Sequence, residues 1–173
     1  MNTEDRAHDS ALAREWIAAA ENEQVTRELV DLYEEVSHAI ESRGPSCWAS
    51  GRCCSFARFG HRLYATGLEA AWSIVNAASV DGALRLDQTA LSLARSAGRC
   101  PFQSRNLCSI HAVRPSPCRV FFCDRDAEDW VIELGAFAHA RIKRIHDTRG
   151  ITYRYAEWRS LLQAFVDSGG PAR

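Results

Sequence analysis

The sequence predicts a small, mostly α-helical single domain of about five helices around a loop-rich cysteine cluster that carries a short β-hairpin. Three observations predict this class. Apolar residues recur at helical spacing in several segments, and these segments are bounded by capping residues and glycines. All seven cysteines fall within residues 47–123, where helical periodicity is weakest. A chain of 173 residues can bury one sizeable core.

Three segments of this single domain are expected. Residues 1–44 form an N-terminal helical segment, residues 45–124 a cysteine-bearing core that binds metal, and residues 125–173 C-terminal helices. The first segment predicts a helix over residues 10–42, broken near Glu21–Glu23 and ended by Gly44 and Pro45. Ser10 is expected to cap its first part. Its apolar residues are Leu12, Trp16 and Ala19 in the first part, and Val25, Leu29, Leu32, Val36 and Ile40 in the second.

The middle of the chain predicts short elements between loops. Residues 46–60 are expected to form a loop and residues 61–65 a short strand. Thr66 and Glu69 fit a capping box that opens a helix running to about Ala78. Asp87 is expected to cap a helix over 88–97 that buries Leu91 and Leu93 and stops at Gly98. A hairpin is predicted around residues 104–106.

The end of the chain predicts two helices joined by a short extended piece. Asp126 is expected to cap a helix over about 127–147. The extended piece covers residues 151–155, and an amphipathic helix covers 156–167. The inner stripe expected for the first of these helices is Trp130, Leu134, Phe137, Ala138, Arg141, Ile142 and Ile145.

Composition narrows the function classes. The first ten residues lack a basic and an apolar stretch, so no signal peptide is expected, and no apolar run is long enough for a membrane span. We therefore expect a cytoplasmic protein in a reducing compartment. Seven cysteines there favour metal or redox chemistry over a disulfide framework.

Charge is distributed unevenly along the chain. Residues 1–42 hold eleven acidic residues and three arginines, whereas residues 43–119 hold ten arginines and only Glu69, Asp81 and Asp87. These arginines could form a solvated surface, neutralise an anionic metal–thiolate site, or bind an anionic partner. A nucleic-acid module with a structural zinc is possible but not favoured, because the aromatic residues are not interleaved with basic ones.

The cysteines form two groups that we interpret as two halves of one site. Cys47, Cys53 and Cys54 precede the other four by about 45 residues. No Cys-x-x-Cys pair occurs, so a standard zinc module is disfavoured, and thiolate ligation remains compatible with zinc or with an iron–sulfur cluster. Adjacent side chains diverge in extended backbone, so Cys53 and Cys54 are expected to have different roles.

The order of motifs resembles a cysteine-cluster family with the motif CxxCxxCC, described as zinc- or iron-chelating, to whose broad group a flagellin lysine methylase belongs. Cys47, Ser50, Cys53 and Cys54 match the upstream motif, with Ser50 where the family has a cysteine. Downstream, Cys-Pro-Phe at 100–102, Cys-Ser-Ile-His at 108–111 and Arg-Pro-Ser-Pro-Cys-Arg-Val-Phe at 114–121 match the family's other pieces.

The resemblance implies a metal-binding protein, with an iron–sulfur cluster placed before zinc. The alternative is an enzyme of methyl-transfer or redox type that uses the metal site, for which the sequence offers no catalytic residue. Any four of seven thiols could be ligands, with Cys123 and one of the Cys53–Cys54 pair as leading candidates for spare thiols. The candidate metal ligands are Cys47, Cys53, Cys54, Cys100, Cys108, Cys118 and Cys123.

Side chains around the cysteines have expected supporting roles. Arg114 and Arg119 flank Cys118 and are expected to donate hydrogen bonds to sulfur or to anchor the loop. His111 could bind metal, but packing is the favoured role. An apolar jacket around the site is expected from Trp48, Phe56, Phe59, Phe102, Phe121 and Phe122.

Overall fold

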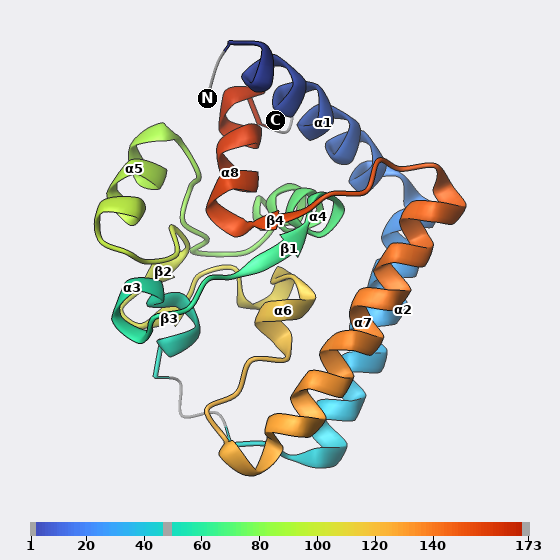
Figure 1. The fold of residues 1–173 in the computed structure, drawn as a ribbon, viewed down its shortest axis with the longest axis vertical. Helices are drawn as coiled ribbons and strands as arrows, with labels where there is room; N and C mark the ends of the chain where they lie inside the picture. The colour runs from blue at the N-terminus through green and yellow to red at the C-terminus, as the bar shows by residue number, and fades with distance from the viewer. Residues whose placement is uncertain (1–2, 47–49, 171–173) are drawn as a thin grey trace.

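The computed structural model describes residues 3–46 and 50–170, and in these ranges the chain is mostly α-helical, as predicted (Figure 1). The eight described α-helices are α1 Thr3–Glu21, α2 Glu23–Arg43, α3 Phe56–Phe59, α4 Gly67–Ala77, α5 Gln88–Ser96, α6 Ser116–Arg119, α7 Glu128–Arg149 and α8 Trp158–Asp167. The remaining elements are the strands β1 Tyr64–Thr66, β2 Gln103–Ser104, β3 Leu107–Cys108 and β4 Tyr155–Glu157, and the 3₁₀ turns η1 Arg52–Cys54, η2 His111–Val113 and η3 Arg125–Ala127.

The predicted break in the N-terminal helix is confirmed. Asn22 adopts extended backbone, and its Oδ1 accepts hydrogen bonds from the backbone N–H groups of Gln24 and Val25, so it caps α2. Gly44 ends α2 in the left-handed conformation, with φ of 65°. The expected cap at Ser10 is wrong, because α1 already begins at Thr3 and Ser10 lies inside it.

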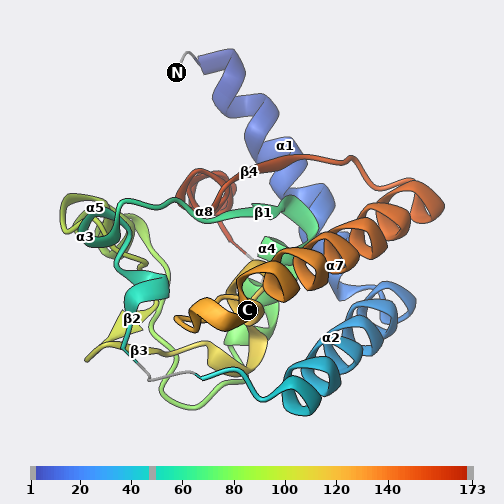
Figure 2. The ribbon, with the colours of Figure 1, turned by 60° about the horizontal axis from the view of Figure 1, so that its bottom comes forward.

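Helices α2 and α7 run side by side along one edge of the molecule (Figures 1 and 2). Arg141 on α7 forms an ion pair with Glu35 on α2 at 3.0 Å, and Arg149 pairs with Glu28. The expected cap at Asp126 is wrong, because Ala127 occupies the capping position without a side-chain bond. The set of residues expected on the buried face of α7 is also too large: Leu134, Ala138, Ile142 and Ile145 are buried, but Phe137 is 42% exposed.

The main core forms where α1 packs against α4 and α8. Trp16 is fully buried there, and its indole Nε1 donates a hydrogen bond to the carbonyl of Thr152 at 2.8 Å. Gly67 at the start of α4 makes this packing possible. A Cβ at this position would lie 2.3 Å from the Trp16 ring, so no larger residue fits without displacement.

Two small antiparallel sheets complete the fold. The predicted hairpin is confirmed: Gln103 pairs with Cys108, and Arg105 and Asn106 form its turn with positive φ. The second sheet joins β1 to β4, with Ala65 opposite Ala156. The extended pieces predicted at 61–65 and 151–155 were placed too early, because the strands are Tyr64–Thr66 and Tyr155–Glu157, and their pairing was not predicted.

Helix α5 confirms one prediction and corrects another. The carboxylate of Asp87 accepts a hydrogen bond from the backbone N–H of Ala90 at 2.8 Å and so caps the helix as expected. Leu91 is fully buried, whereas Leu93 is 63% exposed. Leu93 lies two positions after Leu91 and therefore points away from the face that the helix buries.

Candidate metal centre

A buried carboxylate fixes the segment that carries Cys118. Glu69 caps α4 as the sequence predicts, with its Oε2 accepting from the backbone N–H and hydroxyl of Thr66. Its Oε1 reaches across to Ser116 and accepts from the backbone N–H at 2.9 Å and from the hydroxyl at 2.6 Å. The sequence reasoning missed this second role. A signal was present, because Glu69 is the only acidic residue between Glu41 and Asp81.

Backbone hydrogen bonds join the two cysteine-bearing loops. The N–H of Cys100 donates to the carbonyl of Cys54 at 2.8 Å, and the N–H of Ala57 donates to the carbonyl of Gly98 at 2.8 Å. The side chain of Gln103 adds a bond to the carbonyl of Gly51 at 3.1 Å. The upstream loop therefore lies directly against the hairpin, as the interpretation of two half-sites requires.

Cys53 and Cys54 do not lie in extended backbone. They form the 3₁₀ turn η1, which follows Gly51 in the left-handed conformation. Their sulfurs are 3.9 Å apart. The premise that their side chains diverge is therefore wrong. The separation is close to the roughly 3.8 Å edge of a tetrahedron built with zinc–sulfur bonds of about 2.3 Å.

Five thiols from three segments gather at this junction. Cys54 interacts with Cys100, Cys108 and Cys53. Cys118, on α6, lies within electrostatic reach of Cys100, Cys108 and Cys53. Cys54 and Cys100 are buried, and the other three are half-buried, so water is largely excluded from the group.

The thiols differ in acidity because they share protons. A hydrogen bond with Cys54 lowers the pKa of Cys53 to about 6 and that of Cys108 to about 7, although burial opposes both shifts. The same contacts, with Cys100 first, raise the pKa of Cys54. Burial, followed by the charges of neighbouring thiols, raises the pKa of Cys118.

The two arginines beside Cys118 have different roles. Arg119 is buried, donates from Nε to the carbonyl of Arg114 and from Nη2 to that of Ala112, and lies 4.1 Å from the Tyr33 ring centroid. It anchors the loop, which is one of its two expected roles. The charge of Arg114 lowers the pKa of Cys53 and Cys108. Its buried Nε has no hydrogen-bond partner among the described residues.

Of the two remaining predicted cysteines, only Cys123 falls within the described residues. Cys123 is half-buried, and its sulfur lies 3.6 Å from the hydroxyl of Ser50, the residue that stands where the family motif has a cysteine. Cys47 and Trp48 fall outside the described residues. Among the described residues, no group of three or more Cys, His, Asp or Glu side chains already has the arrangement that holds a metal ion.

The expected apolar jacket is only partly formed. Phe56 and Phe102 are buried, but Phe59 and Phe121 are 41% and 38% exposed. His111 is exposed rather than packed, and its Nε2 lies 2.5 Å from the Nη1 of Arg114.

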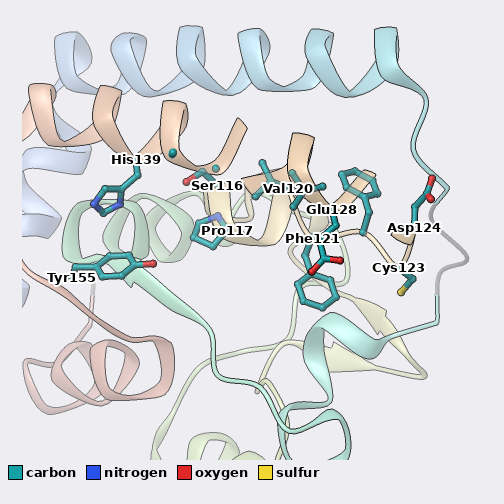
Figure 3. Close-up of a pocket in the computed structure, with 13 residues that line it drawn as sticks. Ser116, Pro117, Val120, Phe121, Cys123, Asp124, Glu128, His139 and Tyr155 are labelled. Atoms are coloured by element: carbon teal, nitrogen blue, oxygen red, sulfur yellow. The ribbon is translucent and has the colours of Figure 1, made fainter. Parts of the chain in front are cut away.

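A cavity of about 610 Å³ lies between α6 and α7. Figure 3 shows its two ends: His139 and Tyr155 lie at one, and Cys123 and Asp124 at the other. Ser116, the residue that Glu69 holds, lines its centre. The cavity therefore adjoins the same short helix that carries Cys118.

The fold and the thiols define a class of protein, a helical scaffold with a loop-built group of soft sulfur donors. A model of the family named CxxCxxCC, described as a "putative zinc- or iron-chelating domain", matches residues 46–134, just over half of the chain. The chain belongs to this family, and the resemblance expected from its motifs is confirmed. No curated protein and no solved structure matches the chain. None of the described helices is long and apolar enough to cross a membrane.

Proposed function

We propose that the protein binds metal through four of the five gathered thiols, Cys53, Cys54, Cys100, Cys108 and Cys118, and holds an iron–sulfur cluster there, with zinc as the competing metal. The observation that carries the proposal is the interaction of Cys54 with Cys53, Cys100 and Cys108, together with Cys118 within electrostatic reach of those three. Family membership supports zinc or iron. Thiolate is the donor type that both zinc and iron–sulfur clusters accept.

The donor set fits such a group chemically. Four thiolates satisfy a zinc ion or a four-iron cluster. Backbone bonds tie together the segments that carry Cys53, Cys54, Cys100 and Cys108. When bound, the metal replaces the shared protons, and the charge of Arg114 offsets part of the resulting negative charge.

The proposal is tested by metal and sulfide analysis with an absorption spectrum of protein purified without oxygen. Cys54→Ser should lose most of the metal, because Cys54 interacts with three of the other four thiols. Cys123→Ser is the matched control and should keep it, because Cys123 contacts Ser50 instead. Iron with sulfide supports a cluster, and colourless stoichiometric zinc reverses the order of metals. Full metal content in Cys54→Ser would contradict the site itself.

The cavity beside α6 favours one second candidate, an enzyme of methyl-transfer or redox type. A volume of about 610 Å³ lies in the range of small-molecule sites. His139 lines this cavity, and its Nε2 lies 2.9 Å from the hydroxyl of Tyr153, within hydrogen-bond distance. His139→Ala should then abolish turnover of a candidate substrate without changing metal content, whereas unchanged turnover would exclude this role for the cavity.

A further inference from the structure

The stretch of chain from residue 42 to residue 123 combines exposed arginines with only three acidic residues. Between Glu41 and Asp124 the acidic residues are Glu69, Asp81 and Asp87. Glu69 is buried and Asp87 caps α5, so neither is free to pair with a surface arginine.

Several arginines of this stretch are exposed and have no hydrogen bond or ion pair through their guanidinium groups to any described residue. By contrast, the guanidinium groups of Arg141, Arg149, Arg154 and Arg159 each contact a carboxylate. We call four of the unpaired arginines, Arg52, Arg58, Arg99 and Arg105, together with Phe59, the arginine surface.

The loops beside the thiols hold the members of the arginine surface together. Arg52 begins η1, and Arg58 lies in α3. The backbone N–H of Ala57 in α3 donates to the carbonyl of Gly98, and Arg99 is the next residue after Gly98. Arg105 lies in the hairpin turn, which packs against Gly51: a Cβ at Gly51 would lie 2.7 Å from the carbonyl oxygen of Asn106. Figures 1 and 2 both show α3 and the hairpin on the side away from α2 and α7.

An aromatic ring completes the surface. Phe59 is 41% exposed, and the guanidinium carbons of Arg52 and Arg58 lie 5.2 Å and 5.4 Å from its ring centroid. Cation–π attraction of this kind holds the two arginines near the ring. Exposed aromatic rings within a basic surface are the arrangement on which unpaired bases stack.

We infer that the arginine surface binds single-stranded nucleic acid, with the arginines on phosphates and Phe59 stacked on a base. Charge complementarity requires an anionic partner, and planar guanidinium groups match phosphate oxygens in pairs. Short elements carry the surface: a 3₁₀ turn, a one-turn helix and a hairpin. They offer no long helix for the groove of a duplex, so a flexible strand fits better.

The test is fluorescence anisotropy of the full-length, metal-containing protein with a labelled oligouridine or oligothymidine of about 20 nucleotides, longer than the roughly 4–16 that such sites cover. Binding is measured between about 50 and 200 mM salt. Arg52→Ala combined with Arg58→Ala should weaken binding about tenfold or more and reduce the magnitude of the log–log salt slope by about 1.4, or about 0.7 for each lost phosphate contact. Phe59→Ala should weaken binding with little change in slope.

The matched control combines Arg27→Ala with Arg144→Ala. Both residues are exposed, on α2 and α7, and the pair removes the same net charge. The control should bind as the unaltered protein does, and an equal loss would overturn the assignment to the arginine surface. Polyglutamate that competes as well as the oligonucleotide, through the same arginines, would also overturn it in favour of an acidic protein partner.

Folding and metal loading are checked in every variant by melting temperature and metal content. If Arg52 and Arg58 prove necessary for folding, Arg99→Ala combined with Arg105→Ala supplies the same test from the other loop. Absence of binding by the folded, metal-loaded protein at about 50 mM salt would overturn the inference. That result leaves the proposed metal site untouched, because metal content is measured independently.

Discussion

Glu69 holds Ser116, two residues before Cys118, through two hydrogen bonds to one carboxylate oxygen. We predict that Glu69→Ala lowers the free energy of unfolding by about 3 kcal/mol, because it leaves buried donors of Thr66 and Ser116 without acceptors. The same variant should also lower metal retention. Chemical denaturation and metal analysis measure the two effects.

The control for this variant is Asp87→Ala. Asp87 also caps a helix, but its carboxylate is exposed and bonds only to the backbone of α5. Its loss should cost about 1 kcal/mol and leave the metal content unchanged. Equal effects of the two substitutions would show that Glu69 acts as a cap alone.

His146 predicts a dependence of stability on pH. It is 1% exposed, its Nδ1 donates to the carbonyl of Ile151 at 3.2 Å, and its Nε2 has no partner among the described residues. Burial lowers the pKa of His146, and the carbonyl of Ile151 and the charge of Glu69 only partly oppose this. The unfolded chain therefore binds a proton below about pH 6.5 that the folded chain resists.

His146 therefore does not reduce the free energy of unfolding above about pH 6.5. As the pH falls from there toward the folded-state pKa of His146, the free energy of unfolding declines by at most about 1.4 kcal/mol per pH unit. His146→Gln should flatten the dependence of unfolding free energy between pH 7 and 5. His38→Gln, which removes an exposed histidine of α2, is the matched control. Parallel curves for all three proteins would disprove the assignment.

At the scale of elements, two helical glycines predict opposite effects of the same substitution. Gly135→Ala in α7 should stabilise the protein by about 1 kcal/mol, because alanine favours a helix. The added Cβ would lie an ordinary 3.7 Å from Val120. Gly67→Ala should destabilise it by about 1–3 kcal/mol, because the Cβ would overlap the Trp16 ring. Urea denaturation of both variants checks the signs, and a shared sign would contradict the packing described.

The sequence predicts elements well where the signal is local. Thr66 with Glu69, Asn22 near the helix break and Asp87 all act over a few residues, and each lies at or near a predicted boundary. Errors arose where a plausible local cap was overridden. Ser10 could cap a helix, but the chain is already helical seven residues earlier.

Features that depend on distant contacts could not be predicted. The pairing of β1 with β4 joins residues about 90 positions apart, and no local pattern specifies it. The bond from Glu69 to Ser116 spans 47 residues. Clustering of cysteines predicted that two loops meet, but the 3₁₀ turn that aligns Cys53 with Cys54 depends on Gly51 fitting beneath the hairpin.

For the whole molecule, the metal is expected to stabilise one side selectively. Removal of the metal with an added chelator should reduce hydrogen-exchange protection in residues 51–58 and 98–109. Backbone hydrogen bonds between these two ranges join the cysteine loops. Helices α2 and α7 should keep their protection, because their contact rests on burial and ion pairs. Mass spectrometry of exchanged peptides measures both.

The control for chelation is Cys54→Ser without chelator, which should show the same pattern of lost protection. Cys123→Ser should show the pattern of the unaltered protein. Uniform loss of protection across the chain would mean that the metal governs global rather than regional stability.

The carboxylate that joins α4 to α6 has a consequence for how metal is captured. Because Glu69 holds Ser116, the backbone that leads to Cys118 is positioned by contacts of the fold, so in the proposed site this part needs no metal ion to place it. Part of the entropy loss of assembling the site therefore belongs to folding rather than to metal binding, which is the meaning of preorganisation. Such a site should take up metal rapidly after folding. It should release metal slowly, because the segment that Glu69 holds gains no conformational freedom when the metal leaves.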